Sequence, residues 1–119
     1  MTDEELTDAW ESLQLGRAVT HEEHVRVSWV LISRHGGTAG SSRIAAATQA
    51  NCVAMDALDR FDPDLTARWS HAIASAMESS GATTADEFLV RHPEFLNSRL
   101  YGLPTWLTAE SPHPLPGSH

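Results

Sequence analysis

The stretch THEEHVRVSWVLISRHGG, residues 20–37, decides the expected fold. Thr20 is a good N-cap, and Glu23 stands three residues later, where its side chain completes a capping box. Apolar residues then recur at helical spacing until two adjacent glycines stop the pattern. One side of the pattern consists of Val25, Trp29 and Ile32. The stretch predicts an amphipathic helix, although its β-branched residues are also compatible with a strand.

Helical signals recur on both sides of this stretch. Thr2 with Glu5 forms a capping box that opens a helix ending near Gly16, and Asp62-Pro63 is a cap with proline at the first helical position. The expected further helices cover about residues 41–59, 62–81 and 84–89, with a turn or short helix from residue 93. We expect an all-α fold, a compact single-domain bundle of about five helices over residues 1–119, with an extended proline-rich tail at about residues 108–119.

Length and charge limit the possible functions. The chain has 119 residues, enough for one domain, and a net charge of −8 with only 8 Lys and Arg residues. Such an acidic chain lacks the basic surface that nucleic acid or an anionic membrane requires. The acidic N-terminus is unlike a signal peptide, and no apolar run approaches the length of a membrane span. We therefore expect a cytoplasmic protein without nucleic-acid or membrane partners.

The absence of lysine and the presence of a single cysteine exclude several kinds of site. Lysine is absent, which removes Schiff-base catalysis and the phosphate-loop lysine. Cys52 is the single cysteine, so no internal disulfide can form, and its place within a helical pattern indicates a buried structural thiol.

His21 and His24 are the main candidates for a functional site. Their three-residue spacing places both imidazoles on one face of the helix, and that face also carries Val25 and Ile32. An imidazole that faces a core must be hydrogen-bonded, bound to a metal, or part of a polar pocket. The pair therefore indicates either a metal or catalytic site or two structural histidines near a helix end.

His71 is the natural third member of such a site. It lies in mid-helix on a small, polar face, opposite the apolar stripe, so it either faces solvent or lines a cavity against the helix of residues 20–35. Three imidazoles would suit Zn²⁺, Cu or Fe²⁺, and an open coordination position would allow chemistry on bound water or O₂. Without a metal, the same cluster could act as a general acid and base.

The motif around these histidines resembles that of a family of small, mostly bacterial helical proteins, largely uncharacterised. That family carries His-x-x-His-Val-Arg-x-Ala-Trp, then Tyr-His-x-Thr-x-Thr on a later helix, a Leu-Tyr segment and a C-terminal Pro-Leu-Pro. The first motif is matched here by His21, His24, Arg26 and Trp29, with Ser28 in place of alanine. The second is matched at His71 and loosely at Ser75, while Ser70 and Ile73 depart from it. The resemblance implies that His71 joins His21 and His24.

Four further residues are candidates for substrate binding. Arg26 can hold a substrate carboxylate or pair with Glu22 or Glu23, and Ser28 and Ser75 accompany the histidines. Trp29 belongs to a set of four tryptophans that either pack in the core or wall an aromatic pocket. The full set is Trp10, Trp29, Trp69 and Trp106.

These observations predict a small metal-binding helical protein, an enzyme acting on a small organic substrate at a histidine-lined pocket. The first alternative is a metal-free ligand-binding or acid–base protein that uses the same pocket. The second is a protein-interaction module with structural histidines. The expected cofactor is a Zn, Cu or Fe ion, the expected partner is a small molecule, and a homodimer is compatible with the sequence.

Overall fold

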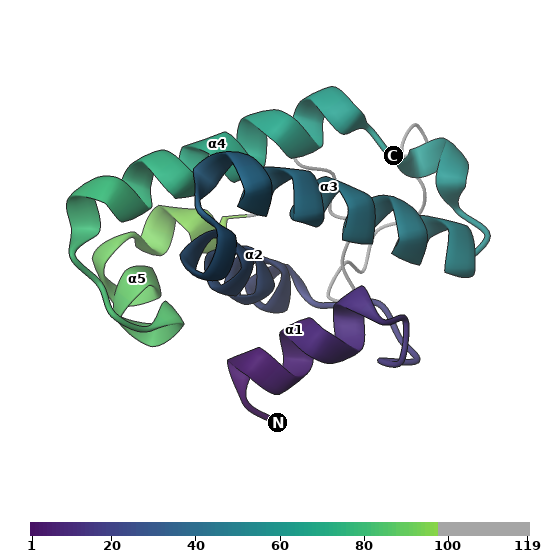
Figure 1. The fold of residues 1–119 in the computed structure, drawn as a ribbon, viewed down its shortest axis with the longest axis horizontal. Coiled ribbons are helices and arrows are strands. Elements are labelled where there is room, and N and C mark those ends of the chain that lie inside the picture. The colour runs from purple at the N-terminus through teal and green to yellow at the C-terminus, as the bar shows by residue number, and fades with distance from the viewer. Residues whose placement is uncertain (98–119) are drawn as a thin grey trace.

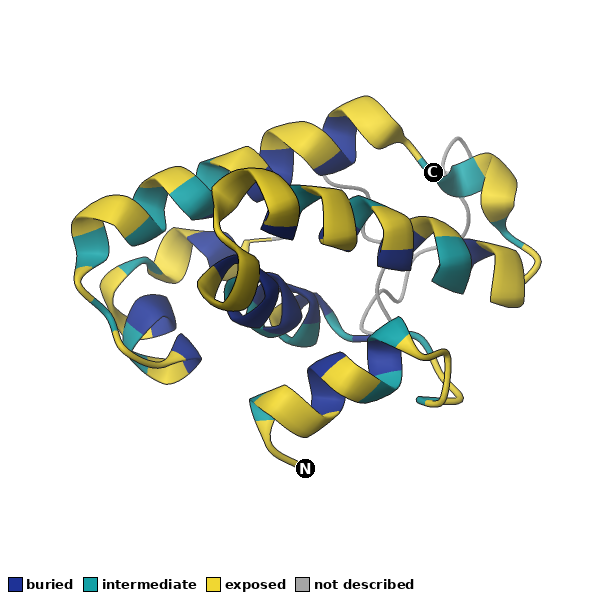
Figure 2. Cartoon of the chain, in the orientation of Figure 1, coloured by how far each residue is buried: buried dark blue, intermediate teal, exposed yellow. Residues whose placement is uncertain are grey.

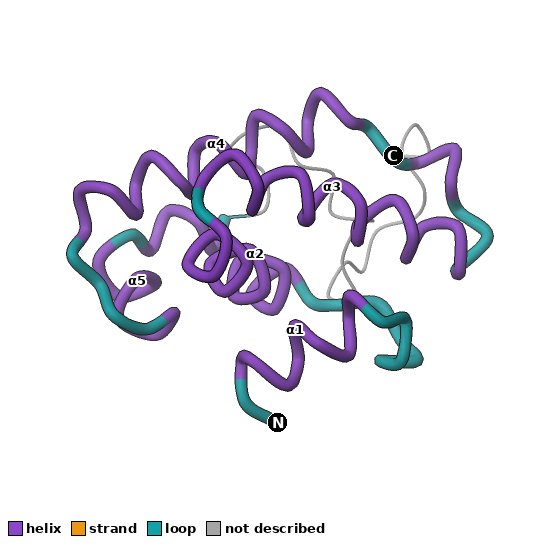
Figure 3. The backbone as a smooth tube through the Cα atoms, in the orientation of Figure 1, coloured by secondary structure: helices purple, strands orange, loops and turns teal. Residues whose placement is uncertain are grey.

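The computed structural model describes residues 1–97, and every regular element within them is a helix. In chain order these are α1 (Asp3–Glu11), α2 (His21–His35), α3 (Gly37–Ala54), the 3-10 helix η1 (Leu58–Arg60), α4 (Pro63–Ser80), α5 (Ala85–Arg91) and the 3-10 helix η2 (Pro93–Leu96). Figure 3 shows this helical path, which confirms the expected all-α bundle. The expected proline-rich tail and Trp106 lie outside the described residues.

Helix α2 is the centre of the bundle. It contacts α1, α3, α4, α5 and η2, and Figure 1 shows α1 on one side of it and α3 and α4 on the other. Most of α2 is buried in Figure 2, and Val25, Val27 and Leu31 are 0% exposed. Each such side chain contributes about 1.5–3 kcal/mol of burial free energy. The sequence stretch that predicts the central helix therefore also supplies much of the core.

Side-chain caps fix where the helices begin. The Thr20 hydroxyl accepts a hydrogen bond from the Glu23 N–H at 3.1 Å, and the Glu23 carboxylate accepts one from the Thr20 N–H at 2.9 Å. The same reciprocal box joins Thr2 and Glu5 at the start of α1. These bonds satisfy backbone donors that have no partner inside the helix. In α2 the cap also fixes the position of His21, the first residue of the helix.

We expect Thr20→Ala to lower the free energy of unfolding by about 1 kcal/mol, because the N-terminal donors of α2 lose their acceptor. Thr38→Ala makes the same chemical change on the exposed side of α3 and should be nearly neutral. Urea denaturation of both variants measures the difference. Equal stabilities for the two variants would contradict a role for the cap.

Helix α3 begins earlier than the sequence predicts. The sequence predicts a helix from about residue 41, but α3 starts at Gly37 and only Gly36, with φ of 87°, separates it from α2. The reason is tertiary. Gly40 is buried where α3 crosses α2, and a Cβ atom there would lie 2.7 Å from the Cα of Ile32. The glycines therefore allow two helix backbones to approach closely, rather than breaking the helix.

Two other helix ends differ from expectation. Helix α1 ends at Glu11 instead of near Gly16, and Leu13, just beyond it, has a φ of 63° and is 47% exposed. Helix α3 ends at Ala54, before Asp56 with its φ of 55°, and η1 follows as a separate short turn. Both ends contain a non-glycine residue in the left-handed region, which the hydrophobic pattern does not reveal. Among the described residues, no helix is both long and apolar enough to cross a membrane.

Candidate functional site

The structure buries both histidines of α2 against the indole of Trp69. The ring centroid of His24 lies 4.5 Å from that of Trp69, and the ring centroid of His21 lies 6.1 Å from it. His21 is 2% exposed, and its Nε2–H donates to the carbonyl oxygen of Phe95 at 2.6 Å. A carbonyl oxygen only accepts, so this bond places a proton on Nε2. His21 therefore connects the start of α2 to η2.

His24 is the unusual group of the pair. It is 4% exposed, and its ring lies edge-on to Trp10 at a centroid distance of 5.5 Å. Neither of its ring nitrogens has a hydrogen-bond partner within the described part of the chain. A buried polar group without a partner costs about 1–3 kcal/mol, so such groups in native proteins call for an explanation.

Burial also fixes the charge of His24. Desolvation, followed by the nearby His21, lowers the pKa of His24 from 6.5 to about 3. The ring is therefore neutral at pH 7, with one N–H donor and one nitrogen lone pair. The surroundings of His24 therefore oppose a positive charge on its ring.

A cavity of about 140 Å³ lies beside His24. Its wall comes from α1, the α1–α2 loop, α2, the second half of α3 and the segment through η1. Apolar and soft side chains make up most of the wall, together with four polar or charged ones. The lining residues are Trp10, Ala18, Val19, His24, Thr48, Asn51, Cys52, Met55, Ala57 and Arg60.

Hydrogen bonds made by two side chains of α3 determine which of their polar groups the cavity can use. The Asn51 amide donates to the carbonyl oxygens of Trp10 and Ala47, both at 2.9 Å, and the Thr48 hydroxyl donates to the Ile44 carbonyl at 2.7 Å. The donors of both side chains are therefore already used, and only their oxygen atoms remain free to accept a hydrogen bond. Burial raises the pKa of the Cys52 thiol, which keeps it protonated and poorly nucleophilic.

The structure does not bring His71 together with the other two histidines. His71 and Ser75 are both exposed on α4. Within residues 1–97, no three His, Cys, Asp or Glu side chains form a group that could hold a metal ion. Of the two positions that sequence reasoning left open for His71, the structure shows the solvent-facing one.

Ser28 is fully buried one turn beyond His24, but its hydroxyl donates to the His24 carbonyl at 2.8 Å. This back-bond within the helix occupies the only proton that Ser28 could offer a substrate. Ser28 is not one of the described residues that line the cavity.

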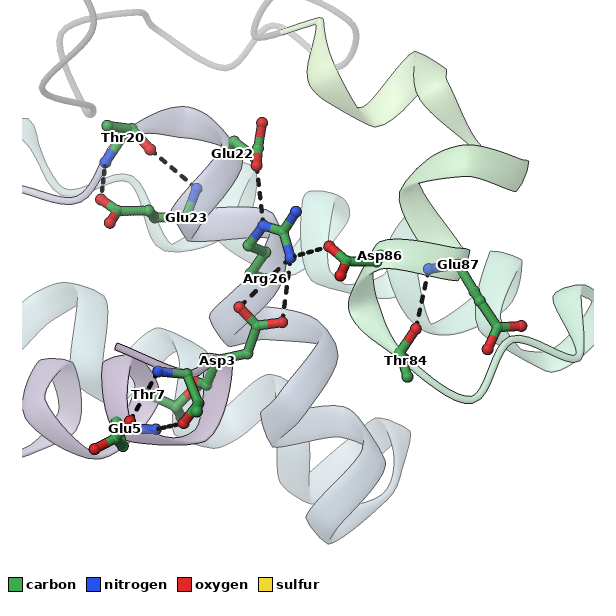
Figure 4. A network of polar contacts seen from close by, with 11 residues as sticks. Asp3, Glu5, Thr7, Thr20, Glu22, Glu23, Arg26, Thr84, Asp86 and Glu87 are labelled. Carbon is green, nitrogen blue, oxygen red and sulfur yellow. Dashed lines mark hydrogen bonds and ion pairs between the residues drawn. The ribbon is translucent and has the colours of Figure 1, made fainter.

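Arg26 and Trp29 lie on a different surface. The Arg26 guanidinium pairs with Asp86 of α5 at 2.7 Å, Glu22 of α2 at 3.0 Å and Asp3 of α1 at 3.2 Å, as Figure 4 shows. Arg26 and Trp29 line a separate polar hollow beside the start of α1. Arg26 thus joins three helices, and a substrate carboxylate would have to displace one of its present partners.

The acidic residues beside the histidines, Glu22 and Glu23, have structural partners of their own. Glu23 forms a paired contact with Arg17 at 2.7 and 2.8 Å in addition to its capping bond. The Arg17 hydrogen bond is the main reason why the pKa of Glu23 falls to about 2. Glu22 and Glu23 therefore act as flank and cap residues rather than as groups of the cavity.

Sequence reasoning found His24 but missed most of the cavity wall. Trp10 belonged to the set that could wall an aromatic pocket, and Cys52 was expected to be a buried thiol. Asn51 and Thr48, two polar residues on the otherwise apolar face of α3, were the available signal for the opposite wall. Ala18 and Arg60 come from loop and 3-10 segments, whose positions no periodicity predicts.

Comparisons of the chain with protein-family models, with curated proteins and with solved structures found no match. The similarity of the histidine motif to that of small bacterial helical proteins therefore stays a resemblance. The geometry around His24 is the evidence on which a functional proposal can rest.

Proposed function

We propose that this protein binds a small organic molecule in the cavity beside His24. The observation that carries the proposal is a neutral, 4% exposed imidazole at the wall of a cavity of about 140 Å³, with no hydrogen-bond partner at either nitrogen among the described residues. Apolar and soft side chains make up most of the cavity wall, which suits a small and largely apolar molecule packed beside the His24 ring. An apolar side chain of the same shape would avoid the cost of an unsatisfied buried group without any ligand, so a histidine here suggests a binding role.

Binding is better supported than acid–base catalysis. A general base works best when its pKa lies near the operating pH, whereas the pKa of His24 is about 3. The thiol of Cys52, with its raised pKa, is no activated nucleophile either. The groups of the cavity are therefore better suited to recognition than to proton abstraction or covalent chemistry.

A Zn, Cu or Fe ion in this cavity is the weaker proposal. His24 and Cys52 line the cavity, but His21 holds a proton on Nε2 for the Phe95 carbonyl and His71 is exposed. Metal analysis of protein purified without an affinity tag tests this proposal. Near-stoichiometric metal that His24→Gln abolishes would support it over the metal-free one.

The proposed partner and cellular compartment follow from the net charge and the single cysteine. A net charge of −8 supports a small-molecule partner rather than nucleic acid, and a buried free thiol at Cys52 is compatible with a reducing compartment such as the cytoplasm. A homodimer stays a proposal that measurement of the molecular mass in solution would test.

The binding proposal can be tested with single-ring compounds and a variant that fills the cavity. Ala57 lines the cavity, so Ala57→Leu should occupy part of its volume while leaving His24 in place. Ala67→Leu makes the same change at an exposed position of α4 and serves as the matched control. The probes are benzene, toluene, phenol and cyclohexanol, detected by saturation-transfer NMR and by shifts of the His24 ring signals.

We expect at least one probe to bind the unmodified protein and the Ala67→Leu control, and to bind Ala57→Leu at least about tenfold more weakly, a loss of about 1.4 kcal/mol. Two results would overturn the proposal. One is no binding by any probe at millimolar concentration. The other is binding that Ala57→Leu leaves unchanged.

A further inference from the structure

We infer that the cavity selects a small monocarboxylate, with its carboxylate group on the guanidinium of Arg60 and its apolar body packed beside Trp10. This inference rests on the proposed binding function and specifies its ligand class. It follows from three features of the described wall: where the wall is exposed, which charges reach it, and which hydrogen-bonding atoms it presents.

The cavity has a buried end and an exposed end. Trp10 is 2% exposed and Val19 is 6% exposed, whereas Met55 is 48% exposed and Ala57 and Arg60 are half-buried. A bound molecule therefore places one end among buried apolar side chains and the other end near water. A ligand that is apolar at one end and charged at the other fits this division.

The charges around the cavity favour an anion. Arg60 is the only charged residue that lines it within residues 1–97, and the neighbouring Asp59 is exposed and does not belong to the wall. Arg60 lowers the pKa of the Cys52 thiol and Asp59 raises it, and the effect of Arg60 is the larger of the two. Because Cys52 itself lines the cavity, the net effect of these two charges inside it is positive.

A guanidinium is well suited to a carboxylate at the exposed end. Its five N–H donors form a planar fork that matches two carboxylate oxygens, and they leave donors for the other contacts of Arg60. Since Arg60 is half-buried, a bound carboxylate keeps part of its hydration and avoids the full cost of burying a charge. One arginine balances one negative charge, so a monocarboxylate fits better than a phosphate dianion.

The buried end favours an apolar body about as large as one six-membered ring. Both ring nitrogens of His24 have almost no accessible surface, and the Thr48 hydroxyl and Asn51 amide donate to backbone carbonyls. None of these three side chains offers a proton to a polar group of the ligand. The cavity measures about 140 Å³, close to the roughly 150 Å³ of an apolar cavity that holds benzene.

The test compares benzoate, nitrobenzene and acetate by isothermal titration calorimetry at pH 7.5 on the full chain. Nitrobenzene has nearly the shape of benzoate but no net charge, and acetate carries the carboxylate without the ring. Water solvates benzoate much better than nitrobenzene, so tighter binding of benzoate requires a positive partner in the site. Arg60→Gln removes that partner, and Arg68→Gln makes the same change at an exposed position of α4 outside the cavity wall.

We expect benzoate to bind at least about tenfold more tightly than nitrobenzene or acetate, a difference of about 1.4 kcal/mol. Arg60→Gln should remove the preference over nitrobenzene, and Arg68→Gln should keep it. Ala57→Leu should weaken benzoate binding, because it fills the space beside Arg60 in the same wall. If Arg60→Gln does not fold, higher salt on the unmodified protein replaces it, and salt should weaken the binding of benzoate but not of nitrobenzene.

Three results would overturn the carboxylate inference while leaving a binding cavity in place. The first is benzoate that binds no more tightly than nitrobenzene. The second is a preference for benzoate that Arg60→Gln, or salt in its place, leaves unchanged. The third is acetate that binds as tightly as benzoate. Failure of both ring compounds to bind at millimolar concentration would instead overturn the proposed function itself.

Discussion

Acidification from pH 7 towards pH 3 should lower the free energy of unfolding by up to about 5 kcal/mol through His24 alone. The pKa of this buried imidazole is about 3 in the folded protein, against 6.5 for a solvated histidine. Below pH 6.5 the His24 imidazole therefore binds a proton in the unfolded chain but stays neutral in the folded protein. The contribution of His24 to stability is constant above that pH and falls by about 1.4 kcal/mol per pH unit between 6.5 and 3.

A second group extends the loss at lower pH. The pKa of Glu23 is about 2 in the folded protein because of its bonds to Arg17 and Thr20, below its ordinary value of 4.5. A lowered carboxylate pKa stabilises the fold above pH 4.5, and this contribution is lost as the pH falls from 4.5 towards 2. Between pH 6.5 and 4.5, however, Glu23 changes little, so this window isolates the histidine contribution.

Urea denaturation at pH 7.5, 5.5 and 4.5 measures the effect, with His24→Phe as the comparison. The variant cannot titrate, so its stability should fall less steeply than that of the unmodified protein across this window. At pH 7.5 it should be as stable or more stable, because it removes two unsatisfied buried nitrogens and replaces the ring with an apolar one. Identical pH dependences for the two proteins would show that His24 is not the buried neutral group described above.

The second large effect is expected at the crossing of α2 and α3. Gly40→Ala should destabilise the fold by about 2–3 kcal/mol, despite the higher helix propensity of alanine. The new Cβ would lie 2.7 Å from the Cα of Ile32 and 3.1 Å from its backbone nitrogen. Backbone atoms cannot rotate away as a side chain does, so the two helices must separate and loosen the core between them.

Gly37 provides the matched comparison within the same helix. A Cβ added there would lie 3.7 Å from the Cβ of Ala74, an ordinary van der Waals contact. Gly37→Ala should therefore change stability by about 0.5 kcal/mol or less, in the stabilising direction. Thermal and urea denaturation of the two variants checks the contrast. Equal effects at the two positions would contradict a close approach of the two helix backbones at Gly40.

Local sequence signals predicted the helical elements well. Thr20 with Glu23 and Asp62 with Pro63 fixed the starts of α2 and α4 within one residue, because a cap depends on groups only three residues apart. The sequence predicted the start of α3 four residues too late. The role of Gly40 depends on its contact with Ile32 in another helix, and the sequence pattern does not show that contact. In a sequence pattern a glycine indicates the end of a helix, whereas in this bundle Gly40 lies inside a helix and contacts a neighbouring one.

For the site, the sequence placed His21 and His24 on the core-facing side of their helix, which the buried rings confirm. It could not place His71, whose polar face suited solvent as well as a cavity. That choice depends on how α4 is rotated against α2, which is set by the packing of Trp69 and Ile73 rather than by His71 itself.

The sequence by itself thus determined the helix composition of this protein, the starts of its main helices and the inward orientation of two imidazoles. These properties follow from caps and periodicity within single helices. Only the tertiary structure decided that His21 bonds to a carbonyl of η2, that His24 is left facing a cavity, and that the opposite wall comes from α3 and η1. Distances between helices depend on the packing of many side chains at once, and no local pattern records them.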